Sequence, residues 1–157
     1  MTNDAVKAGD AAPDFDLPRD GGGRVSLADL KGRKAVLYFY PRDDTPGCTK
    51  EAIAFTGLAA EFEAAGCAVF GISKDGVAKH DKFKTKHELG VTLLSDEEDG
   101  MCEAYGVWGE KKMYGKTFMG IERATFLLDA EGKVARVWRK VKVPGHAEEV
   151  LEAAKAL

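Results

Sequence analysis

The sequence predicts an α/β domain in which helices flank a central mixed sheet. Apolar runs of strand-forming residues alternate with segments whose apolar residues recur at helical spacing. This β-α-β-α-β order predicts parallel strands joined by right-handed crossovers. A turn at residues 130–132 separates the last two runs and predicts an antiparallel hairpin. A length of 157 residues fits one domain, 1–157, with residues 1–7 frayed.

The first elements are expected to be short. Residues 15–17 alternate apolar side chains with aspartate, as a half-buried strand does, and three glycines at 21–23 form a turn. Ser26 and Asp29 have the spacing of a capping box at the start of one helical turn. The apolar run AVLYFYP at 35–41 is interpreted as a strand that is buried on both faces and ended by proline.

The segment after this strand has a helical period. Four apolar residues recur at i, i+3, i+4 and i+7 between Phe55 and Phe62, which predicts one helix over 46–65. The stretch 106–120 is rich in glycine and lysine and is expected to be irregular. The other predicted elements are strands at 67–73, 91–94, 124–129 and 133–141, helices at 75–88 and 101–105, and an amphipathic C-terminal helix.

The composition excludes several classes of protein. Hydrophobic residues make up 45% of the chain and charged residues 31%, which excludes a fibrous or wholly disordered protein. The net charge of −3 argues against a general nucleic-acid binder. No apolar run approaches the ~20 residues of a membrane span, and no secretory signal is visible. The three cysteines form neither a disulfide framework nor a C-x-x-C pair, so a reducing, cytoplasmic location is expected.

The residues between the first buried strand and the long helix are the best candidates for chemistry. Thr45 is a good N-cap and Pro46 a favoured first helical residue, so Cys48 falls in the first helical turn. Free backbone N–H groups and the positive end of the helix dipole there favour thiolate, the nucleophilic form, over thiol. The alternative is that Cys48 is a small apolar residue that begins a helix.

Three other residues need tertiary structure to be interpreted. Cys67 lies in an apolar strand and Cys102 on a short helix, and both are expected to pack in the core. Arg123 opens a strand and is an ordinary surface residue unless its guanidinium points at Cys48. In that position it would favour the thiolate and bind a developing oxyanion.

The segment 38–51 resembles the active-site signature of peroxiredoxins, Pro-x-x-x-Thr-x-x-Cys, which reads here from Pro41 through Thr45 to Cys48. The stretch YFYPRDDTPGCTKEA resembles the branch called bacterioferritin comigratory protein or peroxiredoxin Q. The segments AYGVWGEKKMYGKTFMGIERATFLLD and VWRKVKVPGHAEEVL support the same likeness, which covers residues 8–157.

The resemblance implies a thioredoxin-like fold and a thiol-dependent peroxidase. Such an enzyme reduces hydrogen peroxide and organic hydroperoxides through a cysteine sulfenic acid. Cys48 matches the cysteine that attacks peroxide, Thr45 the hydroxyl that orients it, Pro41 the ring that shields the pocket and Arg123 the arginine that supports the cysteine. The family uses no metal, haem, flavin or selenium. Its reductant is thioredoxin, or else glutaredoxin or glutathione, and we expect a monomer.

The sequence departs from the family where a second cysteine is often found. Ile53 stands at one position of the resolving cysteine, and the helix predicted at 75–88 contains no cysteine. We therefore expect an external thiol to resolve Cys48. Cys102 is the intramolecular alternative, because it follows a strand that ends on the side of Cys48. Cys67 is excluded because it lies beyond a helix ~25 Å long.

Two other functions remain open from the sequence. One is a peroxide-sensing redox switch without significant turnover, which would use the same cysteine once. The other is a binding module whose basic clusters contact phosphates, which the acidic net charge disfavours.

Overall fold

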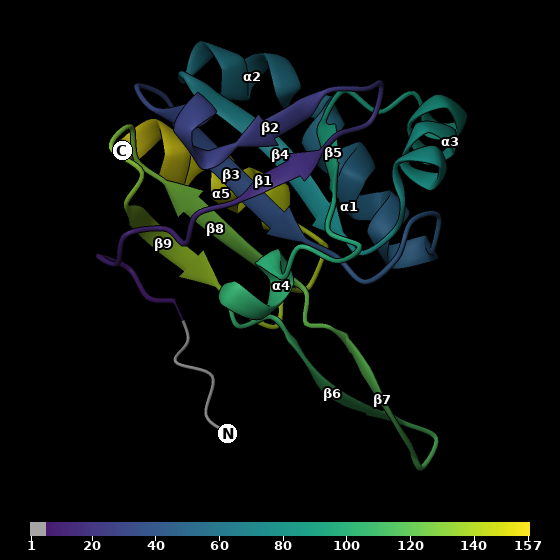
Figure 1. Cartoon of the computed structure of the whole chain (residues 1–157). Coiled ribbons are helices and arrows are strands. Elements are labelled where there is room, and N and C mark those ends of the chain that lie inside the picture. Colours follow the sequence, from purple (N-terminus) through teal and green to yellow (C-terminus); the bar gives the residue numbers. More distant parts are fainter. Residues whose placement is uncertain (1–5) are drawn as a thin grey trace.

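The computed structural model describes residues 6–157 and is built around one mixed sheet (Figure 1). Its five strands stand in the order β5 (Thr92–Ser95), β4 (Cys67–Ser73), β3 (Lys34–Phe39), β8 (Ala124–Leu128) and β9 (Val134–Trp138). β3 pairs in parallel with β4, and β4 with β5, whereas β8 and β9 are antiparallel. The predicted mixed sheet is confirmed, including its parallel part and its terminal hairpin.

The central strand is buried on both faces, as its composition predicts. The side chains of residues 35–39 are fully inaccessible and alternate between two hydrophobic clusters. Leu37 and Phe39 join one cluster, while Val36 and Tyr38 join the other. This burial holds the C-terminal end of β3 in place, and the next loop begins there.

Helices cover one face of the sheet and shorter elements cover the other (Figure 1). The helices that contribute buried residues to the first face are α1 (Pro46–Gly57), α2 (Ala59–Ala64), α3 (Val77–His87) and α5 (His146–Ala156). The other face is covered by β1 (Asp16–Pro18), β2 (Arg24–Ser26), the 3-10 helix η1 (Leu27–Leu30) and α4 (Met101–Ala104). η1 begins with the predicted capping box of Ser26 and Asp29.

The single helix predicted over 46–65 is wrong in one respect. Leu58 interrupts it with φ −107° and ψ 8°, so that α1 ends at Gly57 and α2 begins at Ala59. Thr56 and Gly57 are poor helix formers, which weakens the helix at this point. The apolar period runs across the break because both helices cover the same face of the sheet.

The segment predicted to be irregular forms a hairpin, so this expectation is also wrong. β6 (Trp108–Met113) pairs with β7 (Lys116–Ile121) through a turn at Tyr114 and Gly115, both with positive φ. This turn geometry favours two-residue hairpins. The hairpin extends away from the sheet (Figure 1), so neither of its faces needs a continuous apolar pattern.

Most of the predicted fraying of residues 1–7 lies outside the described residues. Val6 is buried, and the chain that follows is attached to the body. Gly9 N–H donates to the Val134 carbonyl at 2.7 Å, and Ala12 N–H to the Gly132 carbonyl at 3.0 Å. No helix within residues 6–157 is long and apolar enough to cross a membrane.

Candidate active site

Cys48 lies in the first turn of α1, just beyond the C-terminal end of β3. Thr45 occupies the N-cap position with an extended backbone and Pro46 begins the helix, as predicted. Thr45 does not cap the helix through its hydroxyl, because the Oγ1–H donates to the Arg42 carbonyl at 2.9 Å. The side chain of Thr45 therefore stabilises the preceding loop, and the first helical N–H groups are left for other acceptors.

Arg123 is brought to Cys48 by the pairing of β8 with β3. Phe39 pairs with Ala124, so the residue that precedes β8 meets the end of β3. Arg123 Nη2 lies 3.3 Å from Cys48 Sγ. The guanidinium of Arg123 therefore points at Cys48, which is the geometry that a role in supporting the cysteine requires. Cys48 itself is 1% exposed.

Glu51 completes this group, and the sequence reasoning missed it. Its Oε1 accepts from Arg123 Nη1 at 2.6 Å, while among residues 6–157 Oε2 has no hydrogen-bond partner. Burial raises the pKa of Glu51 to about 7, against the opposing effect of Arg123. Burial also disfavours the Arg123 cation, but Glu51 and Cys48 outweigh it and raise its pKa. An acidic residue three positions after Cys48, on the apolar helix face, was the available signal.

Gly47 allows the guanidinium to come this close. A Cβ at position 47 would lie 3.2 Å from Arg123 Nη2, closer than an ordinary van der Waals contact. The small residue before Cys48 thus has a tertiary reason, since Arg123 is 76 positions further along the chain. Sequence reasoning alone gave it no role.

Cys48 lines a cavity of about 640 Å³ between the 41–45 loop and the β6–β7 hairpin. Pro41 and Thr45 line it too, so the structure brings all four predicted site residues together. The hairpin supplies apolar side chains to the opposite wall, among them Met113, Phe118 and Met119. The other lining residues include the cations Arg42, Lys74 and Lys111.

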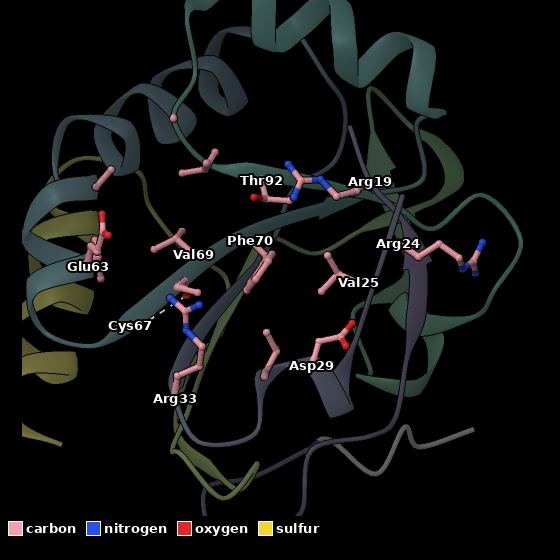
Figure 2. Close-up of a pocket in the computed structure, with 16 residues that line it drawn as sticks. Arg19, Arg24, Val25, Asp29, Arg33, Glu63, Cys67, Val69, Phe70 and Thr92 are labelled. Carbon is pink, nitrogen blue, oxygen red and sulfur yellow. Dashed lines mark hydrogen bonds between the residues drawn. The ribbon is translucent and has the colours of Figure 1, made fainter. Parts of the chain in front are cut away.

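A second cavity of about 600 Å³ contains Cys67 and lies away from this site (Figure 2). Cys67 begins β4 and pairs with Lys34, the first residue of β3, whereas Cys48 follows the other end of β3. Cys67 is 2% exposed, and burial raises its pKa to about 11. The prediction that it packs in the core is confirmed.

Cys102 also packs in the core, but on the other face of the sheet from Cys48. It belongs to the hydrophobic cluster with Leu37 and Phe39, while Cys48 belongs to the cluster beneath the helices. Its backbone N–H donates to Asp96 Oδ2 at 2.8 Å, and burial together with Asp96 raises the pKa of its thiol. The sequence predicts that Cys102 lies on the same side of the sheet as Cys48. Both cysteines do follow the C-terminal ends of parallel strands, but they lie on opposite faces of the sheet.

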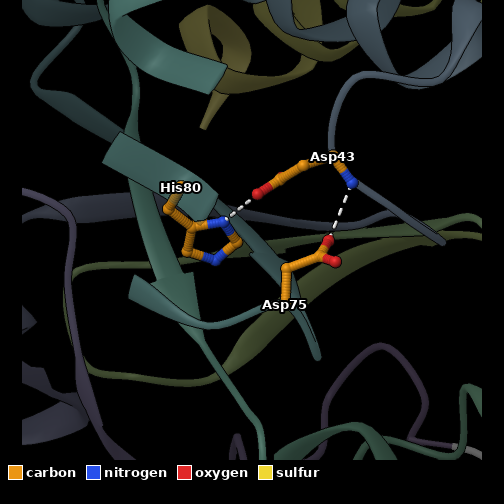
Figure 3. A group of neighbouring side chains, drawn as sticks. All are labelled: Asp43, Asp75 and His80. Carbon is orange, nitrogen blue, oxygen red and sulfur yellow. Dashed lines mark hydrogen bonds and ion pairs between the residues drawn. The ribbon is translucent and has the colours of Figure 1, made fainter. Parts of the chain in front are cut away.

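Three side chains, one of them in the 41–45 loop, have the composition of a metal site. The ligand atoms of Asp43, Asp75 and His80 all lie within 4.8 Å of one another (Figure 3). His80 Nδ1 meets Asp43 Oδ2 at 2.5 Å, and Nε2 meets the Leu94 carbonyl at 2.9 Å. A carbonyl only accepts, so Nε2 carries a proton. Both ring nitrogens are thus engaged, and the group fits a hydrogen-bond network better than a metal.

Comparison with known proteins agrees with this geometry. The family model described as AhpC/TSA family matches residues 8–137. A putative peroxiredoxin bcp of Coxiella burnetii is 53% identical over 94% of this chain and 97% of its own length. The peroxiredoxin Bcp of Bacillus subtilis is 48% identical over 96% of each chain. A structure of Xanthomonas campestris peroxiredoxin Q superposes with a TM-score of 0.89 at 46% identity, covering 95% of this chain and 97% of that one.

The match spans the thioredoxin-like fold and the cysteine loop alike. The matched residues include the β3 strand, the Pro-x-x-x-Thr-x-x-Cys segment and the strand that follows Arg123. The fold class and the family resemblance predicted from the sequence are therefore confirmed. The chain belongs to the AhpC/TSA family, in the peroxiredoxin branch named bacterioferritin comigratory protein or peroxiredoxin Q.

Proposed function

We propose that Cys48 is the thiol with which this peroxiredoxin attacks peroxide. As a peroxiredoxin, the protein is a thiol-dependent peroxidase and an oxidoreductase. The observation that carries the assignment is the 3.3 Å contact between Cys48 Sγ and Arg123 Nη2 in the first turn of α1. Cys48 Sγ accepts a hydrogen bond from a guanidinium, whereas Cys67 and Cys102 are buried and do not line the cavity that contains Cys48.

The reaction forms an S–O bond and breaks the O–O bond of the peroxide. The Cys48 thiolate attacks the terminal oxygen and is oxidised to sulfenic acid, while the peroxide is reduced to an alkoxide or hydroxide that takes a proton. Positive potential at the leaving oxygen lowers the barrier. The Arg123 cation and the free N–H groups of the first α1 turn supply this potential.

Thr45 and Pro41 are assigned to the handling of the peroxide. Both residues line the cavity that contains Cys48. The Thr45 hydroxyl proton is donated to the Arg42 carbonyl, which leaves its oxygen lone pairs free to accept from a peroxide hydroxyl. Pro41 has no N–H and presents an apolar ring that shields the sulfur from water.

The substrates are hydrogen peroxide and organic hydroperoxides. The apolar wall of the β6–β7 hairpin provides a surface for the carbon chain of an organic hydroperoxide. A solved structure of the Xanthomonas campestris bacterioferritin comigratory protein, titled for its alkyl peroxide reduction activity, supports this substrate class at 46% identity.

Cys48 sulfenic acid is resolved by an external thiol. Condensation with that thiol gives a mixed disulfide and water, and a second thiol then releases Cys48 as the reductant is oxidised. The proposal rests on Ile53, on an α3 without cysteine, and on the burial of Cys102 on the other sheet face. Thioredoxin is the proposed reductant, with glutaredoxin or glutathione as the alternative. We propose a monomer. We also propose a cytoplasmic location, because the three cysteines in the described part of the chain are free.

The test compares Cys48→Ser with Cys102→Ser, a matched change at a buried cysteine on the other face. Peroxide consumption is measured over many turnovers with a thioredoxin system, and separately with glutathione and glutaredoxin. We expect Cys48→Ser to abolish turnover and Cys102→Ser to retain it. If Cys48→Ser kept a tenth of the activity, the assignment of the nucleophile would be wrong. If Cys102→Ser lost turnover and the oxidised wild type contained a Cys48–Cys102 disulfide, the external thiol would be wrong.

A further inference from the structure

A network of polar side chains, most of them buried, fastens the 41–45 loop to the rest of the molecule, and Figure 3 shows three of its members. We call Tyr40, Asp43, Asp75 and His80 the loop latch. In the latch, Asp43 Oδ1 accepts from the Tyr40 hydroxyl at 2.5 Å, and Oδ2 meets His80 Nδ1 at 2.5 Å. The Asp43 backbone N–H donates to Asp75 Oδ2 at 2.7 Å. The peroxidase chemistry proposed above uses none of these four side chains.

The latch is held together by a buried ion pair. The side chains of Asp43 and His80 are both completely inaccessible to solvent. His80 Nδ1 faces Asp43 Oδ2 and Nε2 faces the Leu94 carbonyl, and an imidazolium can donate to both oxygens. Burial disfavours this cation, but Asp43, the Leu94 carbonyl and Asp75 outweigh it and raise the pKa of His80. Removing one partner of such a pair leaves the other charge buried and uncompensated.

The same loop contains an aspartate with a left-handed backbone, which is less favourable for aspartate than for glycine. Asp44 has φ 62°, in the left-handed region that side chains other than glycine rarely adopt. Its carboxylate meets Lys86 Nζ and His87 Nε2, each at 2.8 Å, at the C-terminal end of α3. Both of these contacts are on the surface, where ion pairs contribute little. The buried pair of Asp43 with His80 is therefore the main link between the loop and α3.

We infer that His80 is a positioning residue for the peroxide reaction, an inference that rests on the proposed role of Cys48. Through Asp43 it fixes the 41–45 loop, and so places Thr45 and the first turn of α1. That placement brings Cys48 Sγ to 3.3 Å from Arg123. His80 lies in α3 and does not line the cavity that contains Cys48, so its effect on the reaction is indirect.

The latch affects the two half-reactions in opposite directions. The closed loop serves the attack on peroxide, because it holds the sulfur beside Arg123. Resolution requires the reverse, because an external thiol must reach a Cys48 that is 1% exposed. Loosening the latch therefore slows sulfenic acid formation and speeds its reaction with thiol.

The test uses His80→Gln, which removes the charge while keeping a hydrogen-bonding side chain. We expect the rate constant of Cys48 with hydrogen peroxide to fall at least about tenfold, the scale for a lost hydrogen bond to a charged group. The reaction of the sulfenic acid with dithiothreitol should become several-fold faster, and amide exchange over residues 41–50 should increase. Tyr40→Phe removes one hydroxyl and should give smaller changes of the same sign, which keeps the test decisive if His80→Gln does not fold.

Leu17→Ala is the control, because Leu17 is fully buried in the cluster on the other sheet face and lies outside the latch. It should lower stability and leave both rate constants near those of the wild type. Equal slowing of both half-reactions in His80→Gln, or unchanged exchange over 41–50, would overturn the inference. The exchange measurement does not depend on turnover, so its failure is distinguishable from a wrong assignment of Cys48.

Discussion

The Arg123 guanidinium divides its hydrogen bonds between two partners that both prefer a cation. Nη1 donates to Glu51 Oε1 and Nη2 to Cys48 Sγ, so one guanidinium contacts both the carboxylate and the sulfur. Because five N–H donors in a rigid fork are specific to arginine, lysine would not replace it. The contact is made by a residue whose sequence neighbours predicted nothing about its direction.

Arg123→Ala is expected to slow the reaction of Cys48 with peroxide by roughly 10²–10³-fold, the scale for one oriented donor to a developing oxyanion. Removal of the guanidinium also leaves Glu51 buried without its partner. The measurement is the rate constant with hydrogen peroxide, with Arg136→Ala as a control at an exposed arginine of β9. A wild-type rate in Arg123→Ala would show that the 3.3 Å contact has no part in the reaction.

At the scale of elements, the start of α1 combines a helix cap with a reaction site. Thr45 has the backbone conformation of an N-cap, and Pro46 fixes the first helical φ. The Thr45 hydroxyl nevertheless donates to the Arg42 carbonyl, so it does not stabilise the helix as a capping side chain would. Sequence preference for an N-cap thus predicted the boundary of the helix and not the hydrogen bond.

Thr45→Val should therefore affect rate far more than stability. We expect peroxide reduction to slow by roughly 10²-fold or more, because the oriented hydroxyl is lost while the shape is kept. The free energy of unfolding should change by less than the ~1 kcal/mol of a lost N-cap. Thermal unfolding and the peroxide rate constant are measured on the same sample, beside Thr45→Ser. A large loss of stability with an unchanged rate would contradict this assignment.

At the scale of the whole molecule, His146 joins the sheet to the helical layer. His146 is the first residue of α5. Its Nε2 lies 2.8 Å from Thr125 Oγ1 of β8, and its ring packs edge-on against Phe55 and Trp138. Burial lowers the pKa of His146 to about 4. In the folded protein the imidazole of His146 therefore stays neutral down to about pH 4. In the unfolded chain the same imidazole is protonated below its ordinary pKa of about 6.5.

This difference predicts loss of stability in acid. The contribution of neutral His146 to the free energy of unfolding is fully present above about pH 6.5. About 2–3 kcal/mol of it is lost as the pH falls toward 4. Glu51, with a pKa raised to about 7, acts in the opposite direction over part of this range. The effect is therefore measured as the difference between wild type and His146→Gln in denaturant unfolding at pH 7 and pH 4.5. Parallel pH dependence of the two proteins would contradict the prediction.

The sequence by itself determined the order of the elements and the position of the nucleophile. Apolar runs such as 35–41 can be buried on both faces only as central strands, and alternating helices then require a layered α/β fold. Cys48 was placed by chain neighbours alone, since Thr45 and Pro46 fix a helix start within three residues of it. The active-site segment was also similar enough to a known family to be assigned to it.

Only the tertiary structure decided which distant residues meet at that cysteine. Strand pairing of β8 with β3 delivers Arg123, and the helix face of α1 delivers Glu51. Cys48 and Cys102 lie on opposite faces of the sheet, although both come after the C-terminal ends of parallel strands. Local preferences govern backbone conformation over a few residues, whereas contacts across the chain depend on register and on which face a side chain leaves. No local pattern encodes the partner of His80, because Asp43 lies 37 positions away in the loop between β3 and α1.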